Sequence, residues 1–287
     1  MSQQHHADGP PPSSLELERR AFRRRQSVRS VLLGAASTVV FAVAVWAFVV
    51  NTPGWARVQD SFFDVDTAVA AFPRVAQGFL VNLRILAAAV VGVAIVAILV
   101  AFLRTLRGAV FFPLRVLATV YTDVFRGIPL IIMLFLIGFG VPGLVQTRIS
   151  AELLGTIALI VTYSAYVSEV IRAGIEGVHP SQRMGARALG LTHGQTLRLV
   201  VLPQAIRRQA PPLMNDFVAM QKDVGLVSIL GIVDAVRGAQ IETARFADFT
   251  PYIVAAVLFV LLAIPTIRLA DWVTARLRRR EQMGAIV

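Results

Sequence analysis

The sequence predicts an all-α integral membrane protein with about six transmembrane helices and both termini in the cytoplasm. Hydrophobic residues make up 56% of the 287 residues, and the mean hydropathy is +0.69. A soluble core of this size cannot cover so much apolar surface, so lipid must cover the remainder. The net charge of +11 lies between the apolar runs, without basic patches interleaved with aromatic residues, so we expect no nucleic-acid partner.

The apolar runs place the six expected spans along the chain. A helix needs roughly 20 apolar residues to cross the hydrocarbon core, and residues 31–50 meet this length without a charge. This run is longer than the apolar region of a secretory signal, so we expect an uncleaved anchor helix. Five further spans are expected at 78–103, 116–140, 151–174, 212–233 and 252–270. The spans at 116–140 and 212–233 carry charges and helix-disturbing residues.

The distribution of arginine predicts the orientation. Eighteen arginines lie in the N-terminal tail, the second and fourth connections and the C-terminal tail, against five in the alternate segments. Because positive residues stay in the cytoplasm, this asymmetry places both termini there. We therefore interpret the arginine clusters as topology signals. The absence of cysteine and the presence of only four histidines argue against disulfides and against a metal site.

These patterns divide the chain into four parts. Residues 1–30 are expected to be a disordered basic cytoplasmic tail and residues 31–50 the anchor helix. Residues 78–275 are expected to form a five-helix membrane domain that includes a cytoplasmic segment at 176–208, and residues 276–287 a basic tail.

The cytoplasmic segment 176–208 is far longer than a turn and is patterned as two short helices. Pro180 suits a first helical turn, and Gly190 suits a left-handed helix stop. Thr192 and Gln195 have the spacing of a capping box that begins a second helix, which Pro203 closes or bends. Such a pair forms a knob that could fit a partner's groove; the alternative is an amphipathic pair lying on the bilayer surface.

Residues 185–191 (GARALGL) and 195–204 (QTLRLVVLPQ) resemble the cytoplasmic signature of binding-protein-dependent ABC importer permeases. In that signature Glu-Ala-Ala precedes three residues, Gly, nine residues, Ile, one residue and Leu-Pro. The chain keeps this spacing from Gly190 to Pro203, but Met184 and Gly185 replace the first two residues. The resemblance implies that the knob docks on an ATP-hydrolysing subunit. The coupling residues that it implies are Met184, Gly185, Ala186, Leu189, Gly190, Thr192, Leu202 and Pro203.

Further segments resemble the polar amino-acid branch of this family, over roughly residues 78–279 and without the first span. They are residues 124–130, 165–175, 213–228 and 251–252. The branch more often has a hydroxyl residue and Ser or Ala where this chain has Val224 and Gly225, so no substrate contact is assigned to Val224. The resemblance implies a permease core with one extra N-terminal helix, in the bacterial plasma membrane. It also implies two ATP-binding subunits, a second permease chain, identical or different, and an extracytoplasmic solute-binding protein.

The energy source is expected on another polypeptide. A phosphate loop needs a lysine that follows a glycine, because backbone amides cradle the phosphates while the amine reaches them. The only lysine, Lys222, follows Gln221. We therefore predict that the chain is not an enzyme and holds no cofactor, and that ATP and Mg²⁺ are bound by the partner ATPase.

Ionisable residues at membrane depth indicate the transport route, because they face a cavity or one another. Asp216 and Asp223 lie along one helix face with Met220 between them. We hypothesise that four residues of this helix and one of the fourth span line the route for a zwitterionic amino acid: Asn215, Asp216, Lys222, Asp223 and Tyr163. The alternative is a packing network between two permease subunits.

Two pairs with three-residue spacing, Glu169 with Arg172 and Asp123 with Arg126, are expected to be local ion pairs. Pro129 removes an amide donor inside the third span and predicts a kink or a hinge. Two other functions stay open from the residues alone. One is an ion-coupled secondary transporter that uses Asp216, Lys222 and Asp223, and the other is a membrane scaffold. Neither requires the cytoplasmic signature.

Overall fold

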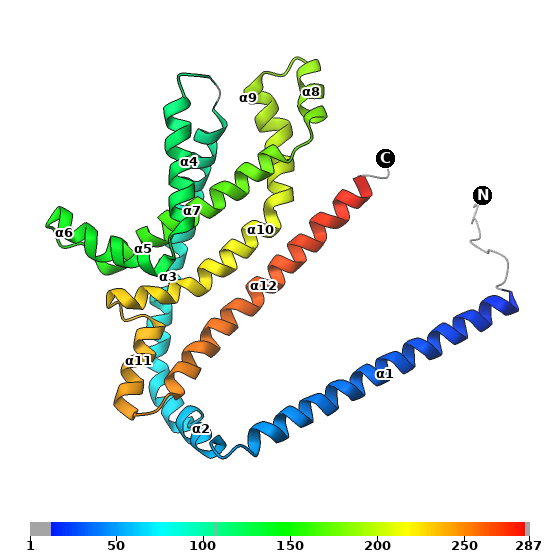
Figure 1. The fold of residues 1–287 in the computed structure, drawn as a ribbon, viewed down its shortest axis with the longest axis vertical. Coiled ribbons are helices and arrows are strands. Elements are labelled where there is room, and N and C mark those ends of the chain that lie inside the picture. Colours follow the sequence, from blue (N-terminus) through cyan, green and yellow to red (C-terminus); the bar gives the residue numbers. More distant parts are fainter. Residues whose placement is uncertain (1–12, 107, 285–287) are drawn as a thin grey trace, which may run out of the picture. The chain divides into compact units, whose positions relative to one another are not determined.

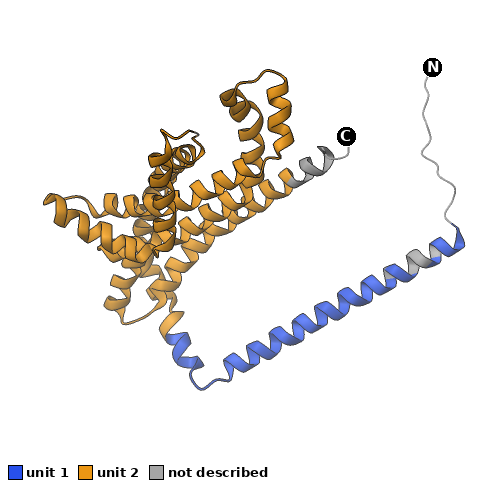
Figure 2. Ribbon diagram, turned by 45° about the horizontal axis from the view of Figure 1, so that its top comes forward, with its two compact units in different colours: residues 1–60 blue, residues 61–287 orange. Residues whose placement is uncertain are grey.

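The computed structural model describes residues 13–106 and 108–284, and these ranges contain helices and no strand. The chain forms two compact units, residues 1–60 and 61–287, which Figure 2 shows in different colours. Within the described residues, four helices are long and apolar enough to cross a membrane, and two bent helix pairs bring the candidate spans to six. The predicted all-α class and number of spans are confirmed, whereas the side on which the termini lie stays a prediction.

The first unit is built around one long helix, α1 (Ser14–Val50). Its N-cap residue is Ser13, whose hydroxyl accepts a hydrogen bond from the amide of Glu16. The 37 residues of α1 span about 55 Å, well beyond the hydrocarbon thickness of about 30 Å. The expected disorder is therefore wrong for residues 14–30, because the cap starts the helix well before the apolar run. Residues 1–12 of the expected tail lie outside the described residues.

The second unit begins earlier than the predicted boundary at residue 78. After α2 (Trp55–Phe62), the helix α3 (Val65–Thr105) starts at the cap Asp64, whose carboxylate accepts from the amide of Thr67 at 2.8 Å. The ring of Phe62 stacks on Phe249 at 5.1 Å, and the amide of Phe249 donates to Ser61. These contacts with the last part of the chain bring the residues from Ser61 onward into the unit.

The predicted third span is sharply broken. It consists of α4 (Phe112–Gly127), α5 (Leu130–Phe135), a π-helical turn η1 (Leu136–Gly140) and α6 (Val141–Val145). The two legs, 112–127 and 130–145, meet at 108°. The break lies at Ile128, which is extended because the following Pro129 disfavours helical backbone. The sequence indicated this disturbance but not a bend of this size.

The central helix α7 (Ala151–Glu176) leads into α8 (Pro180–Ala188) and α9 (His193–Thr196). The chain then continues without interruption through a π-helical turn η2 (Leu197–Val201) into α10 (Leu202–Asp223). Pro203 was expected to close the second helix or to bend it, and the first of these alternatives is wrong. A proline lacks a backbone N–H and is tolerated here because it stands in the first turn of α10, directly after the π-helical turn.

The fifth predicted span, 212–233, lies within a longer bent helix pair and ends at its bend. Residues 193–230 end in the 3₁₀ helix η3 (Val224–Leu230), and α11 (Ala235–Phe246) follows at 55°. Gly231 makes the turn possible with a φ of 80°, a conformation that glycine adopts readily. The last helix, α12 (Thr250–Gly284), extends through most of the predicted basic tail at 276–287. Residues 285–287 lie outside the described residues.

The core of the second unit forms where α3 and α7 pack together, with α5 and η3 against them (Figure 1). Its largest cluster contains thirteen buried residues: Ile85, Leu86, Ala89, Val93, Leu130, Leu134, Ala158, Leu159, Tyr163, Met220, Val224, Val227 and Ile232. The approach of α3 to the start of α11 is very close, since a side chain at Gly78 would collide with the carbonyl group of Asp234. The two broken spans are thus held against continuous helices.

Candidate functional site

The predicted cytoplasmic knob has the local structure that its sequence indicates. Pro180 stands at the start of α8, and Gly190 adopts a φ of 78° after the helix ends. The hydroxyl of Thr192 accepts from the amide of Gln195, while the side chain of Gln195 accepts from the amide of Thr192 at 2.9 Å. The expected stop and capping box are therefore confirmed, and α8 and α9 form a corner at one end of the bundle (Figure 1).

The coupling residues divide into exposed and buried positions. Leu189 is 83% exposed and Met184 is 63% exposed, so two large apolar side chains lie on the surface of the knob. Ala186 is buried. Gly185, Thr192 and Pro203 are exposed, whereas Leu202 is half-buried. An exposed apolar pair on a rigid corner is a surface that a partner's groove can cover.

The knob is attached firmly to the end of α7. A small cluster of Ile175, Val178, Val201 and Ala205 joins α7 to η2 and α10. The guanidinium of Arg183 donates to the carbonyl of Ile175 at 2.5 Å, and that of Arg208 donates to Gly177 at 2.6 Å. These two arginines bind free carbonyl groups where α7 ends, which is a structural role beyond the topology role assigned from sequence.

An ionic network lies next to this attachment. Glu169 pairs with Arg172 at 2.5 Å, as the three-residue spacing predicts. The same carboxylate also binds Arg104 of α3 at 2.6 Å, and Arg172 additionally pairs with Glu176. The sequence could not indicate Arg104, because it precedes Glu169 by 65 positions. The network ties the last turn of α3 to the last turns of α7.

The second predicted ion pair is wrong. Both Asp123 and Arg126 belong to the described part of the chain, and no salt bridge joins them. The guanidinium of Arg126 instead lies over the ring of Tyr166, 5.7 Å from its centroid. The hydroxyl of Tyr166 donates to the carbonyl of Arg126 at 2.9 Å. A cation–π contact with α7 takes the place of the local pair because Asp123 is exposed.

The five predicted pathway residues do not all gather in one place. The hydroxyl of Tyr163 donates to the carboxylate of Asp223 at 2.8 Å. Asp216 is half-buried, and its Oδ2 atom has no hydrogen-bond partner among the described residues. Asn215 and Lys222 are exposed on the single chain. The structure therefore joins Tyr163 to Asp223 and leaves Asn215 and Lys222 on the outer side of α10.

Sequence reasoning missed a buried polar junction around Asn82 of α3. Asn82 is 1% exposed, and its amide nitrogen donates to the carbonyl of Val224 at 3.1 Å and to Asp234 at 2.9 Å. Its amide oxygen accepts from the backbone N–H of Ala235 at 3.0 Å. Asp234 also caps α11 by accepting from the amide of Arg237. One side chain thus holds both sides of the break between η3 and α11. A lone asparagine within an apolar run was the available signal.

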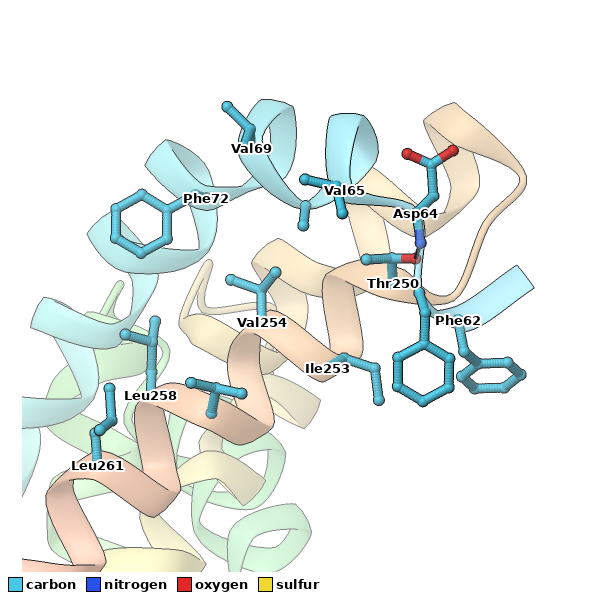
Figure 3. Close-up of a pocket in the computed structure, with 13 residues that line it drawn as sticks. Phe62, Asp64, Val65, Val69, Phe72, Thr250, Ile253, Val254, Leu258 and Leu261 are labelled. Carbon is cyan, nitrogen blue, oxygen red and sulfur yellow. Dashed lines mark hydrogen bonds between the residues drawn. The ribbon is translucent and has the colours of Figure 1, made fainter. Parts of the chain in front are cut away.

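An apolar pocket of about 510 Å³ lies between α12 and the start of α3. Figure 3 shows the side chains that line it. Its only polar side chains belong to Asp64 and Thr250. The carboxylate of Asp64 caps α3, and the hydroxyl of Thr250 accepts from the amide of Asp64 at 3.1 Å. Because its lining is almost wholly apolar, this pocket suits a hydrocarbon chain of lipid better than a zwitterionic ligand.

Comparison with known proteins gives consistent matches. The family model for binding-protein-dependent transport system inner membrane components matches residues 108–279. The chain is 32% identical over 202 residues to ArtQ of Bacillus subtilis, an arginine transport system permease protein, covering 70% of this chain and 91% of ArtQ. It is 34% identical over 208 residues to the glutamate/aspartate import permease protein GltK of Escherichia coli, covering 67% and 92%.

Solved structures show the same fold. A crystal structure of an amino acid ABC transporter with histidines contains a chain that is 33% identical, with a TM-score of 0.68. The match covers 74% of this chain and 98% of the other. A chain of the MetNI methionine ABC transporter, solved in inward-facing conformations, gives a TM-score of 0.51 at 20% identity over 71% of this chain and 94% of that chain. This second likeness concerns the fold alone.

Proposed function

Because the chain belongs to the family of binding-protein-dependent transport system inner membrane components, we propose that it moves a polar amino acid into the cytoplasm by ATP-driven alternating access. The chain is a multi-pass permease component of the bacterial plasma membrane. The names of its relatives support an amino-acid substrate, and two of them transport arginine or glutamate and aspartate. Hydrolysis belongs to a separate subunit in this proposal.

The observation that carries the proposal is the knob formed by α8 and α9. It presents Leu189 and Met184 to solvent from a corner fixed by Gly190 and by the capping box of Thr192. This surface suits insertion into a groove of an ATP-binding subunit, which would hold ATP and Mg²⁺ itself. Two such subunits, one for each of two permease chains, complete the proposed assembly.

Movement of the knob can reach the membrane core along two rigid connections. One is the uninterrupted run from α9 through η2 to α10, which carries Asp216 and Asp223. The other is the attachment to α7 through Arg183 and Arg208, since α7 carries Tyr163. A tilt of the knob would therefore change the distance between Tyr163 and Asp223, whose side chains are hydrogen bonded in this conformation.

We propose that Tyr163, Asp216 and Asp223 line the substrate route. The half-buried carboxylates of Asp216 and Asp223 can offset the desolvation of an amino acid's ammonium group. Asn215 and Lys222 face away from this group on the single chain, where a second permease chain can cover them. They belong either to the far wall of the route or to the interface between the two chains. An extracytoplasmic binding protein would deliver the amino acid.

The test is co-purification of the ATP-binding subunit with the tagged chain from its native cell in mild detergent. Leu189→Asp places a charge on the exposed tip of the knob without disturbing packing, so we expect the subunit to be lost or strongly reduced. Val110→Asp is the matched control, because Val110 is 86% exposed and lies outside the knob. Equal recovery of the ATP-binding subunit from both variants would contradict docking through the knob.

A further inference from the structure

A crevice outside the transport route opens at the end of the bundle that carries α8 and α9. It has a volume of about 400 Å³ and lies between the last turn of α3, the first half of α4 and the last turns of α7. Figure 1 places the start of α4 at the same end as α8 and α9. Its lining residues are Arg104, Phe112, Arg115, Val116, Thr119, Val120, Arg172 and Glu176.

The crevice carries more positive than negative charge. Two of its three arginines, Arg104 and Arg172, are balanced by Glu169 and Glu176 through the ionic network. Arg115 is different. One nitrogen of its guanidinium donates to the carbonyls of Leu106 and Gly108 at 3.0 and 2.9 Å, which carry no net charge. No carboxylate of the described residues pairs with Arg115, so its charge is available to an anion.

Apart from Thr119, the remaining wall is apolar and faces outward from α4. Phe112 is 60% exposed, Val120 52% and Val116 41%. These side chains occur on a helix that belongs to a candidate membrane span, so the hydrocarbon chains of lipid can reach them. The crevice therefore combines a cationic end with an apolar side, next to the connection between α3 and α4. Its ligand must be an amphiphile with a negative head.

We propose that this crevice binds an anionic phospholipid. The guanidinium of Arg115, with Arg104 and Arg172 beside it, holds the phosphate, since arginine presents several donors to phosphate oxygens. An acyl chain lies along Phe112, Val116 and Val120. Because Arg172 and Glu176 belong to the turns of α7 that lead into α8, the bound lipid braces the base of the knob. The site is independent of the amino-acid route.

The test is native mass spectrometry of the purified full-length chain, with any subunits that co-purify, titrated with phosphatidylglycerol or phosphatidylcholine. The wild type is expected to retain phosphatidylglycerol in preference to phosphatidylcholine. Arg115→Gln is expected to weaken phosphatidylglycerol binding about fivefold, the effect of one basic residue at an anionic membrane surface. Arg148→Gln removes the same charge from an exposed position before α7 and is expected to bind as the wild type does.

Arg115 also binds the turn after α3, so Arg115→Gln could lose lipid through a folding defect. A second variant separates this effect from loss of the charge. Val116→Trp keeps every arginine and fills the apolar side, and it too is expected to lose the lipid. Addition of glycerol 3-phosphate distinguishes a site for a lipid headgroup from a site for a soluble phosphate. It is expected to leave the bound phosphatidylglycerol in place, whereas displacement would assign the crevice to a soluble phosphate and overturn the proposal. Equal binding by wild type and Arg115→Gln, or equal retention of both lipids, would also overturn it.

Discussion

Asn82 shows how a single residue can hold a broken helix in place. Its side chain makes three hydrogen bonds, two to backbone groups on either side of the break between η3 and α11 and one to Asp234. Backbone polar groups freed by a break must find partners in a membrane protein, because no water is available in the hydrocarbon core. Asn82 therefore makes the irregular fifth span possible.

We predict that Asn82→Leu lowers the free energy of unfolding by roughly 2–4 kcal/mol, because it leaves buried groups of Val224, Asp234 and Ala235 without partners. The melting temperature in detergent measures this loss. Asn215→Leu is the matched control, since Asn215 is exposed on the single chain and its melting temperature is expected to stay unchanged. Equal melting of wild type and Asn82→Leu would show that the junction contributes nothing to stability.

Residues that interact within one helix are easier to predict from the sequence than residues that interact between helices, although Tyr163 and Asp223 were predicted to line one route and are hydrogen bonded between α7 and α10. The pair of Glu169 with Arg172 follows from the spacing of three on a helix. The partner Arg104 comes from α3, and Asn82 lies 152 positions before Asp234. Such long separations leave no pattern in one sequence. The pair of Asp123 with Arg126 had the correct spacing, but Tyr166 of α7 binds Arg126 instead.

At the scale of elements, the helix ends of the knob could be predicted from the sequence, because each end is fixed by residues next to it in the chain. Gly190 and Gly185 provide a direct comparison, since no atom lies within 4 Å of a side chain added at either position. They differ in backbone, because Gly190 has a φ of 78° whereas Gly185 lies within α8. Only Gly190 therefore needs to be glycine on conformational grounds.

We predict that Gly190→Ala destabilises the knob by about 1 kcal/mol through left-handed strain. Gly185→Ala should instead stabilise α8 by roughly 0.5–1 kcal/mol, because alanine loses less backbone freedom in a helix. Hydrogen exchange of the amides of residues 181–200 measures both effects, as faster exchange in the first variant and slower exchange in the second. Similar changes in both would mean that added volume and not backbone strain decides the stability of the knob.

The sequence predicted that the third and fifth spans are irregular but not the shape of either. Pro129 indicated a kink, whereas the 108° bend depends on packing of α5 against α7 and η3. Of the two alternatives for Pro203, a helix end was wrong, because proline in the first turn of an α-helix does not interrupt it. The size of a bend depends on the helices that pack around it. Those helices lie far from the proline in the sequence, so the residues near the proline do not indicate the size.

At the scale of the whole molecule, the second unit contains everything that the family match covers. The match at 108–279 and all three hydrophobic clusters fall within residues 61–287. The first unit adds α1 with its arginine-rich start. Either α1 or the second unit can set the orientation of the chain in the membrane, and cysteine labelling distinguishes the two.

The chain contains no cysteine, so single substitutions report which side of the membrane a residue faces. Thr147 precedes α7, whereas Val110 lies in the connection before α4, at the end of the bundle that carries the knob, and both are exposed. We predict that an impermeant maleimide labels Thr147→Cys in intact cells and labels Val110→Cys only after permeabilisation, because the connection around Val110 is rich in arginine. The reverse pattern would contradict a cytoplasmic knob.

The same two substitutions in a chain of residues 61–287 test the role of α1. Without the first 60 residues, twelve arginines remain in the segments predicted to be cytoplasmic and four in the segments predicted to be outside. This asymmetry is still strong, so we predict the same labelling pattern as in the full chain. A reversal confined to the shortened chain would mean that the arginines of α1 set the orientation. An unchanged pattern would leave α1 as an addition to a unit that orients itself.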